Sequence, residues 1–352
     1  MTEGKILVTG GAGFIGSHYV RSLVAKGSEV VTLDALTYAG NLANLDKVQD
    51  APNHLFVTGN IADRELVARL FAEHRPTAIV NFAAESHVDR SIDEPEAFID
   101  SNIVGVFILL EACREYLRNH QNAGAFRFLH VSTDEVYGQI EQDAATEDGK
   151  YDPSSPYAAS KAAADHLVRA WNRTYGVPAN ITNCTNNYGP YQFPEKLIPL
   201  TISRALQCES LPLYGDGLQE RDWLHVEDHC RALEAVLSRG TAGQAYNIAS
   251  GETRSNRAVV EEICAALDRL HPRVGGAPYH TLIENVADRP GHDRRYALDG
   301  SKVRAEVGWA PQIAFSHGLT DTVSWYLKND RWIEASRWRY DGSRLGAMVQ
   351  GG

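Results

Sequence analysis

The sequence has little of what marks secreted, membrane-bound and metal-binding proteins. Only five of its 352 residues are cysteine, at wide spacings and without a C-x-x-C pair, which is typical of reduced thiols rather than of disulfides or a zinc site. No apolar run is long enough to span a membrane, and Met1–Lys5 leads directly into a strand-like run instead of a signal peptide. The histidines show no metal-ligand spacing. We therefore expect a cytoplasmic protein with no membrane segment and no metal.

Positive charge is also scarce. The chain has 34 Lys and Arg against 45 Asp and Glu, a formal net charge of -11. This balance argues against nucleic-acid and anionic-membrane partners, although a few local arginines suffice to bind a pyrophosphate. The hydrophobic content of 43% and charged content of 22% are those of an ordinary soluble globular protein, and the length allows two domains.

The first half of the chain alternates strand-like and helix-like segments. Buried strands rich in β-branched residues are expected at Lys5–Thr9, Glu29–Leu33, His54–Thr58, Ala78–Phe82 and Phe126–Ser132. Helices are expected at Phe14–Lys26, from about Asp63 onward, and over two long stretches, Ala97–Asn119 and Ser160–Tyr175. Repeated strand–helix units predict an α/β fold with a Rossmann-type, doubly wound parallel sheet and helices on both faces.

The pattern changes near Asn187. From Asn187 to Glu227 the sequence is rich in Pro, Gly and Tyr, which favours ordered loops over a site rather than a continuous sheet. We then expect a helix, a strand and a mostly helical segment at Asp228–Ser238, Ala245–Ala249 and Thr253–Leu270. The tail carries Trp309, Trp325, Trp332 and Trp338 and is expected to dock, whereas Gly346–Gly352 is expected to fray.

A glycine-rich turn lies between the first strand and the first helix. Gly10, Gly13 and Gly16 would permit a tight turn, the close approach of a pyrophosphate and close helix–sheet packing, with the helix N-terminus facing the phosphates. The strand before and the helix after make this short motif a strong signal for a dinucleotide. Asp34, 18 residues after Gly16 (34 − 16), would bind the ribose hydroxyls and favours NAD over NADP. The alternative for Asp34 is that it caps the next turn.

Tyr157 and Lys161 are four residues apart and would share one face of a helix. An ammonium close to a phenol lowers the phenol pKa, and the phenolate can then accept an alcohol proton while hydride leaves for NAD. The alternative is an exposed helix pair. The glycine turn upstream and the strand Phe126–Ser132 followed by Thr133 favour the catalytic interpretation, and together they resemble the extended branch of the short-chain dehydrogenase/reductase superfamily.

Asp134 and Glu135 follow Thr133 at the end of the fifth strand. The carboxyl edge of a parallel sheet is where ligands bind, and two carboxylates there can divide acid and base work if their environments differ. The alternative is that one caps a helix or that both face water.

The chain resembles the dTDP-glucose 4,6-dehydratases of this superfamily from residue 5 to about 340. The Thr133-Asp134-Glu135 triplet and the run from Asn186 through Lys196 are the most specific matches. Further matching blocks are Gly10–Ser17, Thr37–Leu45, Ala84–Ile92, Tyr157–Lys161, Arg221–His229 and Ala287–Tyr296. The resemblance implies an NAD-dependent hydro-lyase.

It also implies a role for each residue of the catalytic set. Tyr157, assisted by Lys161 and held by Thr133, would take the C4 hydroxyl proton while hydride passes to NAD. Glu135 would then remove the C5 proton, Asp134 would protonate the departing C6 hydroxyl, and hydride would return to C6. Asp134 must be protonated near neutral pH for this, so we expect its pKa to be raised by burial or by its neighbour.

Matching positions extend the implied site beyond the catalytic set. The cofactor would contact Gly10, Gly13, Phe14, Ile15, Gly16, Asp34, Leu36, Thr37, Asn60, Ile61, Phe82, Ala83, Ala84, Ser101, Tyr157, Lys161 and Asn187. The nucleotide sugar, dTDP-glucose, would contact Ser86, Thr133, Asn186, Lys196, Leu197, Pro212, Tyr214, Arg221, Asn256, Arg289 and His292, with Arg221 and Arg289 as pyrophosphate ligands.

The resemblance divides the chain into domains. We expect an NAD-binding domain at 1–189, with 228–250 returning to it, a nucleotide-sugar-binding domain at 190–227 and 251–345, and a flexible tail at 346–352. The helices Ala97–Asn119 and Ser160–Tyr175 would pair in a four-helix homodimer interface, unless their apolar stripes are buried within one subunit.

Three positions depart from the family pattern. Asn60 replaces the usual Asp but can still bond the adenine, Ser250–Asn256 differs from the usual loop while keeping Asn256, and Asn183 stands where Arg is common. The alternatives to a dTDP-glucose enzyme are a UDP-sugar 4,6-dehydratase, a 4-epimerase, or a non-catalytic NAD-binding regulator; the presence of Tyr157, Lys161 and Glu135 argues against the last.

Overall fold

A parallel seven-stranded sheet forms the larger lobe of the protein in a computed structural model that describes residues 4–120, 126–288, 291–337 and 340. The strand order is β10-β6-β5-β4-β1-β2-β3, and every neighbouring pair is parallel. In chain order the strands are β1 (Ile6–Thr9), β2 (Val30–Asp34), β3 (His54–Thr58), β4 (Ala78–Asn81), β5 (Arg127–Thr133), β6 (Ala179–Cys184) and β10 (Ala245–Ile248). Because β1 is central and the order reverses beside it, the Rossmann-type prediction is confirmed.

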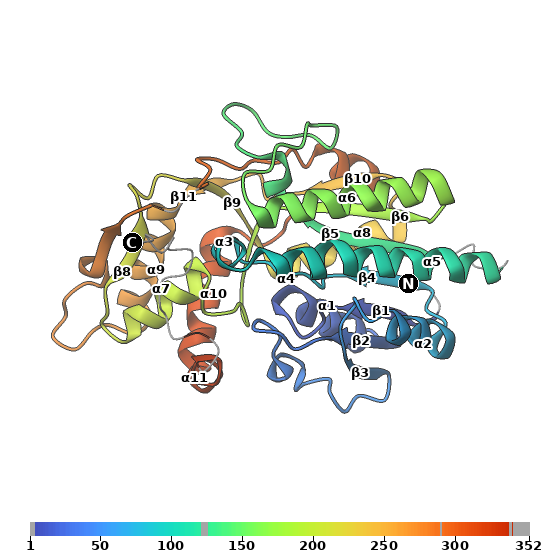
Figure 1. The fold of residues 1–352 in the computed structure, drawn as a ribbon. Helices are drawn as coiled ribbons and strands as arrows, with labels where there is room; N and C mark the ends of the chain where they lie inside the picture. Colours follow the sequence, from blue (N-terminus) through green and yellow to red (C-terminus); the bar gives the residue numbers. More distant parts are fainter. Residues whose placement is uncertain (1–3, 121–125, 289–290, 338–339, 341–352) are drawn as a thin grey trace, which may run out of the picture.

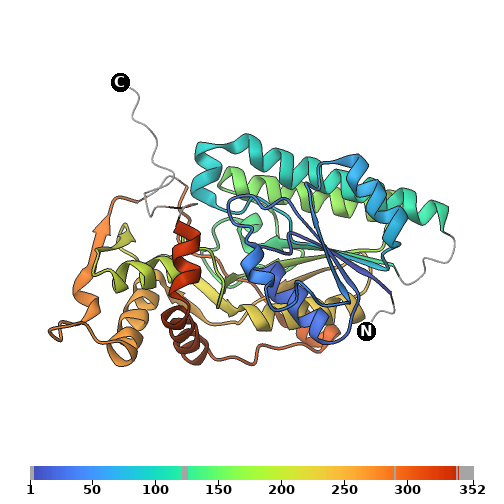
Figure 2. The ribbon, with the colours of Figure 1, turned by 90° about the horizontal axis from the view of Figure 1, so that it is seen from below.

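Helices cover both faces of this sheet (Figure 1). One face carries α1 (Phe14–Ala25) and α8 (Val226–Arg239), and the other carries α2 (Arg64–His74), α5 (Val106–Asn119) and α6 (Pro156–Tyr175). Strands β1, β2, β4 and β5 carry buried apolar side chains on both sides, so two separate hydrophobic cores form, one under each helix layer. Figure 2 shows α5 and α6 side by side along one face.

A smaller lobe packs beside the sheet and has its own core (Figures 1 and 2). It contains two small sheets, β11-β9-β7 and β12-β8, whose strands are β7 (Asn186–Tyr188), β8 (Leu211–Tyr214), β9 (Glu220–His225), β11 (Thr253–Ser255) and β12 (Ile283–Val286). Its helices are α7 (Leu197–Leu206), α9 (Asn256–Leu270), α10 (Phe315–Lys328) and α11 (Asp330–Arg337).

The remaining elements are short. They are η1 (Leu42–Leu45), α3 (Val88–Asp93), α4 (Pro95–Ile99), η2 (Asp100–Gly105), η3 (Asp134–Tyr137), η4 (Tyr279–Leu282) and η5 (Val303–Val307).

The structure corrects several expectations from the sequence. Asn187–Glu227 is not a run of loops, because it contains a helix and the strands β8 and β9. Thr253–Ser255 is a strand that precedes α9, not helix, and β6 was not predicted at all. Residues Val303, Val307 and Trp309, assigned from the sequence to the smaller domain, pack in the core of the larger lobe.

The expected single helix over Ala97–Asn119 is interrupted. Residues Asp100–Gly105 form a π-helical segment, and its wider turn brings the side chain of Asn102 inward. The buried Asn102 amide accepts a hydrogen bond from the Glu85 N–H (2.9 Å) and donates to the Glu85 carbonyl (3.0 Å) and to Ser160 Oγ (2.8 Å). The interruption therefore ties the segment after β4 to the first turn of α6. Trp338 and the tail 346–352 lie outside the described residues.

Candidate active site

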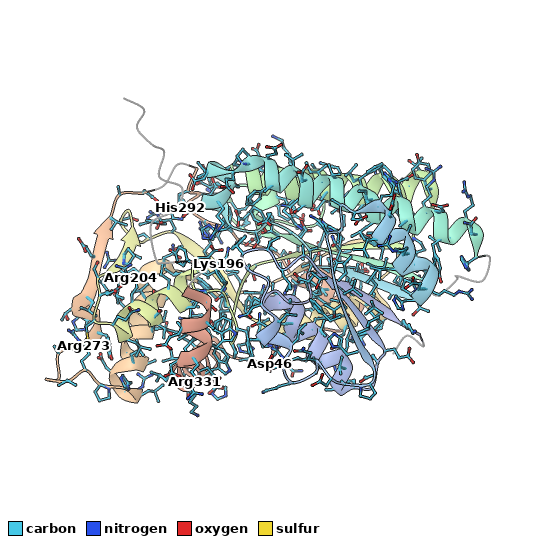
Figure 3. All side chains as sticks on the ribbon, turned by 60° about the horizontal axis from the view of Figure 1, so that its bottom comes forward. Asp46, Lys196, Arg204, Arg273, His292 and Arg331 are labelled. Carbon is cyan, nitrogen blue, oxygen red and sulfur yellow. The ribbon has the colours of Figure 1, made fainter. Side chains whose placement is uncertain are left out.

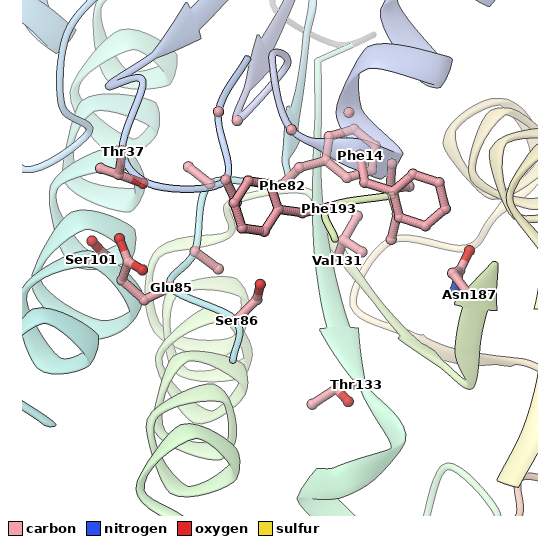
Figure 4. A pocket seen from close by; sticks show the side chains of 18 of the residues that line it. Phe14, Thr37, Phe82, Glu85, Ser86, Ser101, Val131, Thr133, Asn187 and Phe193 are labelled. Carbon is pink, nitrogen blue, oxygen red and sulfur yellow. The ribbon is translucent and has the colours of Figure 1, made fainter. Parts of the chain in front are cut away.

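A deep pocket opens at the carboxyl ends of the central strands, where β1, β2, β4, β5 and β6 end (Figure 4). Except for Leu36, every residue expected to contact the cofactor lines it: Gly10, Gly13, Phe14, Ile15, Gly16, Asp34, Thr37, Asn60, Ile61, Phe82, Ala83, Ala84, Ser101, Tyr157, Lys161 and Asn187. Figure 4 shows Thr37 and Ser101 on one side of the pocket and Asn187 on the other. Leu36 does not line the pocket; it has a positive φ of 52° and forms the turn after β2.

The glycine turn leaves no room for side chains. Gly10 has a φ of 69°, and a Cβ there would lie 2.6 Å from the backbone nitrogen of Ala83; a Cβ on Gly16 would lie 2.2 Å from the Gly10 carbonyl oxygen. Helix α1 starts after Gly13 without a side-chain cap, and its first residues line the pocket. This end of the helix fits the pyrophosphate of a dinucleotide, as the spacing of the glycines predicted.

Asp34, at the end of β2, holds the turn and also lines the pocket. Its Oδ2 accepts a hydrogen bond from the N–H of Ala12 and its Oδ1 from the N–H of Leu36, both at 2.8 Å. Asp34 therefore does cap the following turn, as the alternative interpretation held, and it also faces the pocket. Its carboxylate at the pocket wall offers the acceptor oxygens that ribose hydroxyls need.

The predicted catalytic residues meet at the other end of the pocket. Thr133, Asp134 and Glu135 come from the end of β5 and the following turn, while Tyr157 and Lys161 come from the first two turns of α6; all five line the pocket. Thr133 Oγ1 donates to Asp134 Oδ1 (3.2 Å) and accepts from the N–H of Glu135 (3.3 Å), so this threonine orients both acidic residues.

The two carboxyl groups differ in their surroundings. Asp134 is 3% exposed, and burial, followed by repulsion from Glu135, raises its pKa to about 8. The charge of Arg221, on β9, lowers the pKa of Asp134, but by less than burial and Glu135 raise it. Asp134 is therefore mostly a carboxylic acid at neutral pH, as a proton donor has to be.

The surroundings of Tyr157 disfavour its phenolate. Burial and the charge of Glu135 raise the pKa of Tyr157 well above its ordinary value, and the Thr133 hydroxyl opposes this rise. Lys161 donates from Nζ to the Val131 carbonyl at 2.8 Å. That the Lys161 ammonium lowers the pKa of Tyr157 stays a prediction.

The residues expected to bind the nucleotide sugar are spread more widely. Ser86, Thr133, Asn186 and Lys196 line the pocket, and Lys196 Nζ donates to the Ser86 carbonyl at 3.2 Å. Figure 3 places Lys196 near the middle of the molecule and His292 at the side of the smaller lobe. Leu197, Pro212, Tyr214, Arg221, Asn256 and His292 lie outside this pocket, and Arg289 lies outside the described residues.

Two of these outlying groups are held by other parts of the chain. The His292 ring packs against Tyr214, and its Nδ1 lies 2.6 Å from Asp288 Oδ1. The Arg221 guanidinium stacks over Tyr296 and donates to the carbonyls of Glu220 and Asp293 at 2.8 and 2.9 Å. Arg221 therefore fixes the segment after residue 292, a contact that no local pattern in the sequence indicated.

Sequence reasoning missed four polar residues at or behind the site. Glu85 and Glu195 line the pocket, and burial raises the pKa of each; the Glu195 carboxylate lies 3.0 Å from Arg90 Nε. Asn102 and Asp165 are fully buried behind the pocket wall. No local pattern marked Asn102 and Asp165, because each stands among other polar residues of its helix and only the fold buries it.

Known proteins resemble this chain over nearly its whole length. A family model described as GDP-mannose 4,6 dehydratase matches residues 7–322. The dTDP-glucose 4,6-dehydratase of Xanthomonas campestris pv. campestris (strain B100) is 55% identical over 350 residues, covering 97% of this chain and 99% of that protein.

Solved structures agree with the sequence relatives. The dTDP-glucose 4,6-dehydratase of Streptomyces venezuelae, solved with NAD bound, superposes with a TM-score of 0.87 at 47% identity, covering 94% of this chain and 99% of that one. The corresponding Bacillus anthracis structure, in complex with NAD, gives a TM-score of 0.84 at 44% identity, with 95% and 99% covered. The chain therefore belongs to the family of dTDP-glucose 4,6-dehydratases.

Proposed function

We propose that this protein removes water from dTDP-glucose to give dTDP-4-keto-6-deoxyglucose, with NAD as a cofactor that is regenerated in each turnover. The observation that carries the proposal is the pair of unlike carboxyl groups beside Tyr157. Asp134 is a buried acid with a pKa of about 8, and Glu135 is the adjacent half-buried base. Oxidation of a sugar hydroxyl alone would need only Tyr157 and Lys161, so the acid–base pair points to elimination.

The cofactor would be held by the glycine turn, by Asp34 and by the segment after β4. Bound NAD supplies a hydride acceptor for C4 and later a hydride donor for C6. Tyr157 accepts the proton of the C4 hydroxyl, and Thr133 orients the phenol through the hydrogen bond they share. Because burial disfavours the phenolate, this proton transfer depends on positive charge close to the phenol when the site is filled.

Elimination then follows from the resulting 4-ketone. The ketone acidifies the C5 proton, which passes to Glu135, and the C6–O bond breaks as Asp134 protonates the leaving hydroxyl. One water is released, C6 accepts the hydride and C5 regains a proton. The burial of Asp134 serves this step, because it keeps a proton available at a pH where an exposed aspartate has none.

The substrate is tested by incubating the purified protein separately with dTDP-glucose, UDP-glucose and GDP-mannose. Alkali treatment reveals a 4-keto-6-deoxy sugar by its absorbance. We expect signal with dTDP-glucose above the other two, in line with relatives at 55% identity that act on that compound. Signal only with UDP-glucose would assign a UDP-sugar dehydratase, and C4 inversion without a keto product would assign a 4-epimerase.

We further propose that the protein is a homodimer formed through α5 and α6. These two helices lie next to each other along one face of the larger lobe (Figure 2). Ile99 and Val104, in the turns that lead into α5, are apolar and 48% and 39% exposed. A second copy would cover them.

The dimer is tested with Ile99→Glu, because a buried charge at an interface costs several kcal/mol. Light scattering should give a dimer mass for the wild type and a monomer mass for the variant at the same concentration. Leu270→Glu is the matched control, since Leu270 is 44% exposed on the smaller lobe. A wild-type monomer in dilute solution would remove the proposal.

We place the enzyme in the cytoplasm. All five cysteines are thiols, and four of them are buried, as expected where the environment is reducing. None of the helices in the described part of the chain is long and apolar enough to cross a membrane. Cell fractionation tests the assignment, and recovery of the protein outside the cytoplasm would refute it.

A further inference from the structure

A buried carboxyl group lies behind Lys161, one helical turn further along α6. Asp165 is fully buried, and its Oδ2 accepts hydrogen bonds from Ser132 Oγ and Tyr151 OH, both at 2.9 Å. Asn183 Nδ2 also reaches this oxygen, at 3.3 Å. A strand, a loop and a neighbouring strand therefore all place donors around one carboxyl group. An isolated buried carboxylate is unstable, so Asp165 stays ionised only with a positive charge close to it.

His130 does not supply that charge. Thr9 Oγ1 donates to Asn81 Oδ1 at 2.5 Å, which leaves the Asn81 amide nitrogen to donate to His130 Nδ1 at 3.0 Å. The imidazole then carries its hydrogen on Nε2, 3.6 Å from Asp165 Oδ1. Burial, together with the charge of Lys161, lowers the pKa of His130 far below its ordinary value, so the ring is neutral.

Lys161 is the cation placed to supply it. Its Nζ binds the carbonyl of Val131 and Asp165 binds the hydroxyl of Ser132, the next residue of β5, although no ion pair within 4.0 Å joins Lys161 and Asp165 in the described part of the chain. The side chain is 3% exposed, and its Nζ is fixed by the hydrogen bond to the Val131 carbonyl. Burial lowers the pKa of Lys161 and Asp165 opposes this, whereas burial raises the pKa of Asp165 and Lys161 is the strongest charge that opposes it. Cys184 also faces Lys161, and Arg169, bound to Tyr151 OH at 3.0 Å, acts on Asp165 more weakly.

We propose that Asp165 is the buried counter-ion of Lys161, a positioning residue that keeps the ammonium charged and fixed at the pocket wall. The inference rests on the proposed function only in that the charge of Lys161 assists Tyr157. Asp165 acts through Lys161 and does not line the pocket. The same carboxyl group organises the end of β5, because Asn183 bridges Asp165 and the Thr133 carbonyl, at 3.3 and 3.2 Å.

The test is a direct titration of Lys161. Protein labelled with ε-¹³C-lysine gives one NMR signal per lysine, and Lys161→Arg identifies the signal that belongs to Lys161. In the wild type we expect Lys161 to be charged at pH 7 despite its burial. In Asp165→Asn, which keeps the shape and removes the charge, we expect the Lys161 pKa to fall by about 1–3 units. The rate of C4 oxidation, the step that Lys161 assists, should begin to fall at a correspondingly lower pH than in the wild type.

Tyr151→Phe separates charge from hydrogen bonding. It removes one donor from Asp165 Oδ2 but leaves the carboxylate, so the Lys161 titration should stay nearly where it is in the wild type. An unchanged Lys161 pKa in Asp165→Asn would overturn the proposal. If that variant does not fold, a wild-type Lys161 that is neutral at pH 7 overturns it equally. A Lys161 shift in a protein that dehydrates no nucleotide sugar would instead refute the proposed function and leave the counter-ion standing.

Discussion

Asp134 and Glu135 are adjacent in the chain but stand in different surroundings, because Asp134 turns into the protein while Glu135 stays half-buried at the pocket. The Thr133 hydroxyl contacts both residues: it donates a hydrogen bond to the Asp134 carboxyl group and accepts one from the backbone N–H of Glu135. One turn after β5 thus gives two chemically similar residues different surroundings, as the proposed division into an acid and a base requires.

The first prediction concerns Asp134→Asn. The amide keeps the size of the side chain but has no acidic proton to give to the leaving C6 hydroxyl. C4 oxidation should therefore survive, while water loss slows by about 10²–10⁴-fold. A single-turnover experiment with dTDP-glucose should show reduced cofactor accumulating before product.

Asp152→Asn is the control for that substitution, since Asp152 is a surface carboxylate with a side chain 79% exposed. It should turn over like the wild type. Normal formation of 4-keto product by Asp134→Asn would show that the proton comes from another group.

The second prediction is a pH dependence. With a pKa of about 8, Asp134 loses its proton as the pH rises through 8, so the dehydration step should slow above that pH. The same shift acts on stability. Because the folded pKa lies above the unfolded value, the folded state holds this proton more tightly, and stability falls from about pH 4 to pH 8.

Asp134→Asn removes the titrating carboxyl group, so comparing this variant with the wild type isolates its contribution to the pH dependence of stability. Relative to the wild type, its free energy of unfolding should rise progressively between pH 4 and pH 8, by several kcal/mol in order of magnitude. Chemical denaturation at pH 4.5 and pH 8.5 measures the difference. An equal difference between variant and wild type at both pH values would mean that Asp134 does not hold a raised pKa.

Parts of the fold and site that depend on local patterns could be predicted from the sequence. The spacing of Gly10 and Gly16 after a strand gave the cofactor turn, because the constraint acts within a few residues. Strand β6 could not be predicted in this way. Its buried Asn180 and Asn183 are polar, and their amides bond to Thr241 and Thr133, which only the folded chain brings close.

The same reason explains the outcome at the catalytic residues. The place of Asp134 and Glu135 after a strand indicated two carboxyl groups that could divide acid and base work, whereas the role of each was implied by the family resemblance. The raised pKa of Tyr157 could not be predicted, because burial and the charge of Glu135 are its main causes and neither follows from the place of Tyr157 on its helix. Desolvation depends on the whole fold and leaves no local mark in the sequence.

The third prediction compares two glycines with positive φ. In Gly10→Ala the new Cβ would meet the backbone of Ala83 at 2.6 Å, so the turn must open and NAD binding should fall by more than tenfold. Gly27→Ala is the matched control: Gly27 has a φ of 82°, but nothing lies within 4 Å of its Cβ position. It should cost about 1 kcal/mol of stability and leave NAD affinity unchanged. Calorimetric titration of NAD checks both, and equal affinities would show that the close approach does not matter.

The last prediction concerns a contact between the two lobes. Trp332, on α11, donates from Nε1 to Asn44 Oδ1 at 2.9 Å, and the buried Asn44 donates to the carbonyl of Ala12 in the glycine turn, also at 2.9 Å. The C-terminal helix therefore supports the cofactor turn through one asparagine. Trp332→Phe keeps an aromatic ring but removes the indole N–H. The side chain of Asn44 then loses this hydrogen bond, and the NAD dissociation constant should rise about 2–10-fold.

Trp325→Phe is the control for this contact. Trp325 packs on the same Tyr191 ring as Trp332, but its substitution leaves the hydrogen bond from Trp332 to Asn44 in place. It should reduce stability through lost aromatic contact without a comparable change in NAD affinity. If both variants weaken NAD binding equally, the aromatic cluster as a whole supports the turn. If neither does, α11 stabilises only the smaller lobe. A selective effect of Trp332→Phe would show that retention of the cofactor depends on a residue more than 300 positions from the glycines that bind it.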